Sequence, residues 1–496
     1  MAVTLTKLIF ELSKEKVMNT ATFARYFTIA QLLLLSACGG GGGGKAGVSG
    51  GGSSSATSFI NWTWIGGSDS FGQPGSYGNQ GVTLPANMPQ ALEGAVSWVD
   101  TNNNLWLFGG GGGTGYTDFN DLWKFDGANW TWINGSAVPN QQSIYGAKET
   151  SGATYFPGAR QYSARWTDSS GNLWLFGGYV RTDISPGSTD ASNDLWKYNI
   201  ASNQWALMNG VVTTNTTNPV TPPQPGIYTN SPGSDYPGAR WGTTSWNDPL
   251  TPGVFWLFGG YGLDSIGNNG YLNDLWKFDS NLKQWTYVSG SVNNVNQPSN
   301  YGQIRIESST NVPSARQGAV SWTDSSGNLW LFGGFGLDTG NPINMNDLWK
   351  FNITSGKWTW MSGSSMFDRS GNYGTPGIPS INNIPGARHF AVSWKDSLGN
   401  FWLFGGSGYD WAGNFGALND LWKFDPISRQ WAWMSGSNTR DQIGTYGTLG
   451  DPTNVPGNRD VAVSWTNASG LWLFGGQGVD AIGFPGYYND FWHFQP

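Results

Sequence analysis

Hydrophobic and polar positions alternate in short runs along residues 59–496, and four kinds of run recur in the same order. They read Ala-Val-Ser-Trp, Leu-Trp-Leu-Phe-Gly-Gly, Leu-Trp-Lys-Phe and Trp-x-Trp. Successive side chains of a strand point to opposite faces, so this alternation suits short strands with one aromatic face. No sustained helical period follows residue 58. The pattern predicts an all-β fold built from units of four strands.

The unit occurs six times, which is the decisive feature of the sequence. The run Trp-Leu-Phe-Gly-Gly has its first glycine at Gly109, Gly177, Gly259, Gly333, Gly405 and Gly475. Every tryptophan except Trp241 and Trp411 belongs to one of the repeated runs, so we expect these tryptophans in the core. Four strands per unit, repeated radially, predict a six-bladed β-propeller over residues 59–496.

The two ends of the repeat predict how the ring closes. The last unit ends with Phe491-Trp492-His493-Phe494 and has three strands, whereas Trp62-Thr63-Trp64 stands alone before the first unit. We expect residues 62–64 to lie antiparallel to residues 490–494, as the outer strand of a sixth blade otherwise made by residues 456–494. This arrangement would cover an open sheet edge.

The repeat resembles the kelch repeat. The resemblance rests on the Gly-Gly doublet and on an aromatic residue followed seven positions later by Trp, in the pairs Tyr198 and Trp205, Phe278 and Trp285, Phe351 and Trp358, and Phe424 and Trp431. It covers about residues 59–496, although these units exceed the usual kelch length of about 50 residues. The central domain of galactose oxidase has such a propeller. Its copper site and Tyr–Cys cross-link need histidine ligands and a cysteine, and residues 59–496 contain only His389 and His493 and no cysteine.

The first 58 residues predict an export signal and a tether. Residues 1–37 combine basic side chains with an apolar run ending at Leu35, a signal-peptide pattern whether translation starts at Met1 or at Met18. The following Leu-Ser-Ala-Cys resembles the bacterial lipobox, which implies acylation of Cys38. A plain secretory signal or a short anchor is the alternative. The Gly/Ser-rich residues 38–58 predict a flexible tether. We expect a lipoprotein of the outer membrane or cell surface of a bacterium.

Composition excludes several classes of function. The formal net charge is −7 and only 11% of residues are charged, which disfavours nucleic acid and anionic membrane surfaces as partners. One cysteine allows no intramolecular disulfide, and two histidines make a histidine-ligated metal or a histidine-based triad hard to build. We therefore expect a monomer with no metal and no cofactor, attached to a membrane only through its lipid.

Loop lengths predict two unlike faces. Tight turns follow the first and third strands of each unit, and long segments follow the second and fourth. Function concentrates on long loops carried by a rigid scaffold. Several residues also break the repeat, and these are Leu92, Arg165, Trp241, His389 and Trp411. Among them, Trp411 stands in a long loop and is a candidate for ligand binding.

A Pro-x-x-Arg motif opens five of the six units and allows two interpretations. In kelch proteins that bind acidic peptides, arginines near this point line the channel mouth, which would imply a collar for a carboxylate-bearing ligand. The alternative is structural pairing with one aspartate per unit. The arginines are Arg160, Arg240, Arg316, Arg388 and Arg459, and the aspartates are Asp121, Asp194, Asp274, Asp347, Asp420 and Asp490.

Two further repeated residues are open to two interpretations. Each long loop holds a tyrosine that either stacks on a glycan or pins its loop to the blade. The tyrosines are Tyr77, Tyr145, Tyr228, Tyr301, Tyr373 and Tyr446. Four aspartates beyond the glycine doublet either bind Ca²⁺ or form Asx turns. These are Asp264, Asp338, Asp410 and Asp480.

The sequence therefore favours a lipid-anchored, non-enzymatic propeller that recognises a protein or a glycan on its long-loop face. The alternative is a metal-free carbohydrate-active enzyme of the lyase or epimerase type, because kelch-like propellers also occur in sugar oxidases and epimerases. We identify no catalytic set of residues in the sequence.

Overall fold

A computed structural model describes residues 61–112, 117–180, 191–210, 224–229, 231, 233–480 and 482–495. The proposed signal (1–37), the acylation site Cys38 and the tether (38–58) lie outside these residues. No helix occurs in the described residues, and consequently none there is long and apolar enough to cross a membrane. The all-β prediction is confirmed.

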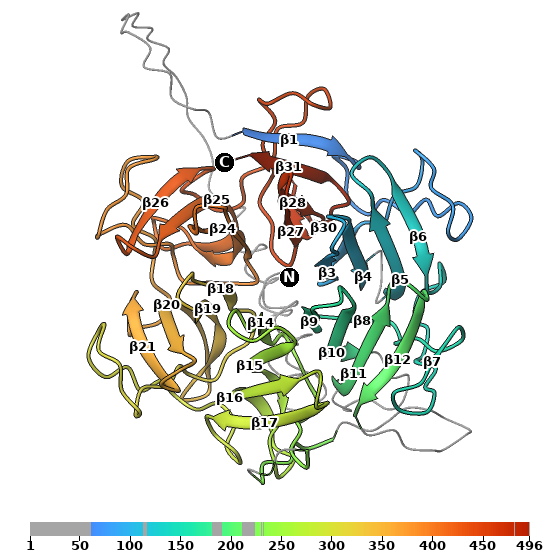
Figure 1. The fold of residues 1–496 in the computed structure, drawn as a ribbon. Helices are drawn as coiled ribbons and strands as arrows, with labels where there is room; N and C mark the ends of the chain where they lie inside the picture. The colour runs from blue at the N-terminus through green and yellow to red at the C-terminus, as the bar shows by residue number, and fades with distance from the viewer. Residues whose placement is uncertain are drawn as a thin grey trace, which may run out of the picture. The chain divides into compact units, whose positions relative to one another are not determined.

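Six antiparallel sheets form the blades of a propeller (Figure 1). Blades one to three contain β3 (Val96–Val99), β4 (Leu105–Gly112), β5 (Thr117–Phe125) and β6 (Trp130–Asn134); β9 (Ala164–Thr167), β10 (Leu173–Val180), β11 (Ala191–Asn199) and β12 (Gln204–Asn209); β14 (Thr244–Asn247), β15 (Val254–Leu263), β16 (Asn269–Asp279) and β17 (Gln284–Ser289).

Blades four to six contain β18 (Val320–Thr323), β19 (Asn328–Asp338), β20 (Asn341–Asn352) and β21 (Lys357–Ser362); β23 (Val392–Lys395), β24 (Phe401–Tyr409), β25 (Phe415–Asp425) and β26 (Gln430–Ser435); β27 (Val463–Asn467), β28 (Gly470–Phe474), β31 (Phe491–Gln495) and β1 (Asn61–Gly66). Short strands extend some sheets, namely β2 (Leu92–Glu93), β7 (Ser151–Gly152), β8 (Arg160–Gln161), β13 (Arg240–Trp241), β22 (Arg388–His389) and the hairpin of β29 (Gln477–Val479) with β30 (Pro485–Tyr487).

The predicted ring closure is confirmed. Strand β1 pairs antiparallel with β31, with Trp62 opposite Phe494, Thr63 opposite His493 and Trp64 opposite Trp492. In Figure 1, β1 lies along the outer side of β31, so the start of the described chain completes the last blade.

The second and third strands are longer than the sequence predicted. We expected long loops between the glycine doublet and the Asn-Asp motif, but β15 runs to Leu263 and β16 begins at Asn269, which leaves residues 264–268 as the loop. In blade four, β19 and β20 are separated only by residues 339–340. The expectation is wrong here because strand pairing resumes beyond the doublet.

A bulge at the glycine doublet makes this continuation possible. The register between β15 and β16 shifts between Phe258 and Gly260, and φ is 62° at Gly259 and 95° at Gly260. A Cβ on Gly259 would lie 2.8 Å from the main-chain oxygen of Arg316 in the next blade. Glycine is therefore required here both for its positive φ and for the close approach of the neighbouring blade.

The hydrophobic core consists of six clusters, one at each junction between neighbouring blades. Each cluster joins aromatic side chains of one blade to leucine, phenylalanine and tryptophan of the next. Around the ring, the inner-strand tryptophan of each blade donates its Nε1–H to a main-chain oxygen of the following blade. The last of these bonds joins Trp465 to Trp106 at 2.9 Å, so the sixth blade is bonded to the first.

Candidate functional site

The five arginines of the Pro-x-x-Arg motif are buried and paired with aspartates of their own blades. In blade four, Arg316 donates from Nη1 and Nη2 to the two carboxylate oxygens of Asp347, at 2.6 and 2.8 Å. Both side chains are 0% exposed. The equivalent pairs are Arg160–Asp194, Arg240–Asp274, Arg388–Asp420 and Arg459–Asp490. The five arginines are therefore structural ion-pair partners of the aspartates. Guanidinium groups buried in this way do not form a ligand-binding collar.

The same aspartate also holds the long-loop tyrosine. Asp347 Oδ2 accepts hydrogen bonds from Tyr301 Oη at 3.0 Å and from Trp349 Nε1 at 2.7 Å. Equivalent Tyr–Asp bonds of 2.6–3.1 Å occur in the other blades. Burial next to the carboxylate raises the pKa of Tyr301. The tyrosines therefore pin their loops to the blades, and the interpretation as glycan-stacking platforms does not fit their hydroxyl bonding.

Blade one lacks the arginine. Leu92 takes its place and is 1% exposed, and no cation of the described residues forms an ion pair with the buried Asp121. Tyr77 Oη and Trp123 Nε1 donate to Asp121 at 2.6 and 2.7 Å. Burial nevertheless raises the pKa of Asp121. This carboxyl group differs in charge balance from its five counterparts.

Asx turns form at three of the four aspartates beyond the doublet. Asp264, Asp410 and Asp480 each accept two main-chain N–H groups of the following residues through Oδ1, at 2.9–3.0 Å. Asp338 instead lies at the end of β19. No group of three or more metal-ligating side chains occurs in the described part of the chain.

Trp411 stands on the tip of the blade-five hairpin. Its side chain is 56% exposed, its main-chain N–H donates to the Asn438 oxygen at 3.1 Å, and the preceding Asp410 forms the Asx turn. The equivalent tip of blade six exposes Ile482 and Phe484, which are 78% and 65% exposed. Hydrogen-bonded tips thus present apolar side chains on the long-loop face of two neighbouring blades.

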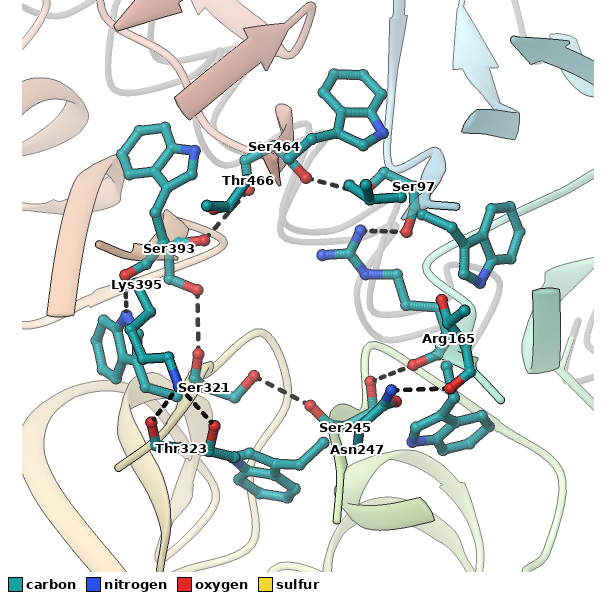
Figure 2. Close-up of a pocket in the computed structure, with 18 residues that line it drawn as sticks. Ser97, Arg165, Ser245, Asn247, Ser321, Thr323, Ser393, Lys395, Ser464 and Thr466 are labelled. Atoms are coloured by element: carbon teal, nitrogen blue, oxygen red, sulfur yellow. Dashed lines mark hydrogen bonds between the residues drawn. The ribbon is translucent and has the colours of Figure 1, made fainter. Parts of the chain in front are cut away.

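A cavity lies on the propeller axis, where the inner strands meet. It has a volume of about 310 Å³ and is lined by three consecutive residues of each inner strand. Figure 2 shows a ring of serines around it, interrupted by Arg165. Each serine hydroxyl donates to the main-chain oxygen of the preceding blade, as Ser97 does to Ser464 at 3.0 Å and Ser321 to Ser245 at 3.1 Å.

Arg165 replaces the serine of blade two and keeps its place in this ring. Its Nη1 donates to the Ser97 main-chain oxygen, and the guanidinium group points into the lumen in Figure 2. No carboxylate of the described residues forms an ion pair with Arg165. Burial without an anionic partner lowers the pKa of Arg165 to about 10. Across the lumen, Lys395 of blade five donates to the Thr323 main-chain oxygen at 3.2 Å.

A second ring narrows the axis on the long-loop side. Its six residues stand two positions after the buried arginine or its equivalent, have φ between 47° and 65°, and form a closed circle of main-chain N–H···O=C bonds of 2.8–3.0 Å. They are Gly94, Tyr162, Gly242, Gly318, Phe390 and Val461. Tyr162 and Phe390 come from opposite blades, and their rings meet with centroids 5.2 Å apart. These two rings form an aromatic plug, which we did not predict. Its signal in the sequence is a large residue standing where other blades have glycine.

In each blade, one residue stands between the buried arginine, or Leu92 in blade one, and the residue of the second ring. Its type varies from blade to blade, and only glutamine occurs twice. These residues are Glu93, Gln161, Trp241, Gln317, His389 and Asp460. His389 Nδ1 lies 2.7 Å from Asn344 Oδ1, and burial lowers the pKa of His389 to about 4. Asp460 accepts a hydrogen bond from Ser407, yet burial raises the pKa of Asp460 to about 6. A neutral histidine and a carboxyl group that titrates near neutrality could take part in proton transfer.

Comparison with known proteins leaves the kelch resemblance a prediction. No family model matches the chain, and no curated protein matches it. The six-bladed propeller is therefore established by the structure alone.

Proposed function

We propose that this chain is a lipid-anchored binding propeller, held at the outer membrane or cell surface of a bacterium through Cys38. Its partner is a protein or a glycan, recognised by the long-loop face. The observation that carries the proposal is the exposure of Trp411, 56%, on a tip fixed by hydrogen bonds. Exposed aromatic side chains on rigid supports supply contact area at low entropic cost.

The anchor is tested by fractionation of cells that express the full chain. Cys38→Ala should leave an unprocessed precursor that no longer partitions into detergent. Normal processing and continued membrane association of the variant would contradict the lipoprotein assignment.

The binding face is tested on a glycan array with the detergent-solubilised full chain. A ligand recognised by the tips should be lost in the double variant Trp411→Ala, Phe484→Ala. Leu398→Ala is the matched control, because Leu398 is 84% exposed but lies in a tight turn on the other face. Equal loss in both variants, or binding that survives the double change, would remove the tips from recognition.

A metal-free carbohydrate-active enzyme is the second candidate, and the pKa shifts of His389 and Asp460 favour it. Groups with shifted pKa values cluster at catalytic sites. Lyase activity would create unsaturated sugar ends, which ultraviolet absorbance follows directly. Activity that is abolished in Asp460→Asn would support the enzyme, and its absence on acidic and neutral polysaccharides would leave the binding function.

A further inference from the structure

Aromatic side chains border the axial cavity on the long-loop side. Tyr162 and Phe390 meet across the axis on the long-loop side, and the cavity lies on the other side of them, between the inner-strand ends that lead into the tight turns. A ligand would therefore enter from the tight-turn side. A volume of about 310 Å³ is at the lower end of small-molecule sites, which run from roughly 300 to 1,000 Å³.

Hydrogen-bond donors and acceptors are unevenly distributed around the cavity wall. Ser97, Ser245, Ser321, Ser393 and Ser464 each donate their only hydroxyl hydrogen to a main-chain oxygen of the neighbouring blade, at 3.0–3.3 Å. Their oxygens can still accept hydrogen bonds from the lumen. Arg165 has five N–H donors, of which one is used in the ring. The wall thus offers several acceptors and one cationic group of donors.

The charge of the wall is positive in an otherwise acidic chain. The 18 lining residues include Arg165 and Lys395 and no carboxylate. The nearest carboxylates along the chain, Asp168 and Asp396, accept main-chain N–H groups of their own turns and the indole N–H of Trp174 and Trp402 at 2.8–2.9 Å. They are engaged in holding the turns. Arg165 is thus a partly enclosed cation without an anionic partner among the described residues, an arrangement that favours an anion.

We propose that this cavity binds a small hydroxylated carboxylate of the sugar-acid class. The carboxylate pairs with the guanidinium group of Arg165, and the hydroxyl groups of the ligand donate to the serine oxygens. A neutral sugar would leave Arg165 unpaired, whereas a simple anion would leave the serine oxygens unused. The ligand is either a free sugar acid or the terminal residue of an acidic glycan.

The test is calorimetric titration of the detergent-solubilised full chain with sodium glucuronate and, separately, with a glucuronate-containing oligosaccharide, at constant ionic strength. We expect saturable binding, affinities for glucose and for acetate lower by about tenfold or more, and weaker glucuronate binding when the titration is repeated at a higher ionic strength. Binding of both glucuronate probes indicates a free sugar acid as ligand, and binding of the oligosaccharide alone indicates a chain end. Both results support the site.

Arg165→Ser is the decisive variant, because serine occupies this position in the other five blades. We expect it to lower the affinity for glucuronate by about tenfold or more, with a melting temperature equal to or above that of the wild type. Lys148→Thr removes the same unit of charge at an exposed position outside the cavity lining and should change affinity by less than about threefold. It controls for a general effect of net charge.

Several results would overturn the proposal. These are the absence of saturable binding by both glucuronate probes, equal affinity in Arg165→Ser, and acetate or chloride binding as tightly as glucuronate. The double variant Trp411→Ala, Phe484→Ala should leave glucuronate binding unchanged, because those side chains stand on the other face. Failure of the loop-tip proposal and failure of the cavity proposal are therefore distinguishable.

Discussion

The rings of Tyr162 and Phe390 contact each other across the propeller axis, with centroids 5.2 Å apart and a tilt of 30° between the ring planes. Both residues have positive φ, 57° and 52°, where Gly94, Gly242 and Gly318 stand in three other blades. Space for the two rings comes from those glycines, since a Cβ on Gly94 would lie 2.8 Å from Tyr162 and one on Gly318 would lie 2.9 Å from Phe390.

Phe390→Gly should therefore be a mild substitution. Glycine relieves about 1–2 kcal/mol of left-handed strain and adds about 0.5–1 kcal/mol of unfolded-chain entropy, so the backbone effects nearly cancel. The remaining cost of the substitution is the loss of the contacts made by a half-buried phenyl ring. Phe404→Ala is the comparison, because Phe404 is 1% exposed and its loss should cost about 3–5 kcal/mol. Urea unfolding of both variants measures the difference, and equal costs would show that the plug is part of the stabilising core.

The closing strand should contribute strongly to stability. Trp62 is 3% exposed and packs against Phe494, Phe404 and Trp394 with ring centroids 4.8–5.7 Å apart. Trp62→Ala should cost about 3–5 kcal/mol of unfolding free energy, as for other buried aromatic residues. Trp411→Ala, at an exposed position, should cost less than about 0.5 kcal/mol. If urea unfolding finds the two variants equally stable, the first strand does not hold the ring closed.

The fold was predictable because the sequence repeats. Six copies of one pattern reveal strand number, blade number and core face together, and the unmatched Trp62-Thr63-Trp64 identifies the closing strand. The lengths of the second and third strands were not predictable, because glycine doublets usually signal turns. Here they form a bulge through which the strands continue, and only the neighbouring blade explains why glycine is needed.

The candidate site was less predictable because it depends on the few residues that break the repeat. The position of Arg165 in the inner strand was visible, but its direction into the lumen and the absence of an ion-pairing carboxylate among the described residues are properties of the assembled ring. The repeated arginines drew attention as a binding collar, yet their aspartate partners come from a strand about 30 residues further along the chain. Repetition at those positions reflected a structural role.

The ion pairs predict unequal effects of one substitution in two blades. Asp347→Asn leaves the buried Arg316 without its counter-ion and should cost about 3–5 kcal/mol. In blade one, Leu92 stands where the other blades have the arginine, so Asp121→Asn breaks no ion pair and should cost at most about 1–3 kcal/mol, the penalty of an imperfectly bonded amide. Thermal and urea unfolding of the two variants at neutral pH make the comparison. A larger loss in Asp121→Asn would mean that its carboxylate has a compensating cation in solution.

Asp460 predicts a pH dependence with a definite sign. Burial raises the pKa of Asp460 from its usual 3.8 to about 6, so the folded state holds this proton over a range of pH in which the unfolded chain has released it. The resulting stabilisation is fully present below about pH 4 and is lost as pH rises through about 6. Asp460→Asn removes this titration and keeps an acceptor for Ser407. The variant should match the wild type near pH 3.5 and exceed it by about 1–3 kcal/mol at pH 8.

Asp451 supplies a control of opposite sign for this prediction. Its exposed carboxylate accepts the main-chain N–H and the hydroxyl group of Thr453, both at 2.8 Å, and these bonds lower the pKa of Asp451. That stabilisation is present above about pH 4 and is lost as pH falls, so Asp451→Asn should be the less stable protein at pH 8 and should match the wild type in acid. Urea unfolding of the three proteins between pH 3.5 and 8 tests both signs together. A constant difference between Asp460→Asn and the wild type across this range would show that Asp460 titrates normally, and the carboxyl group would then have no special role in the enzyme candidate.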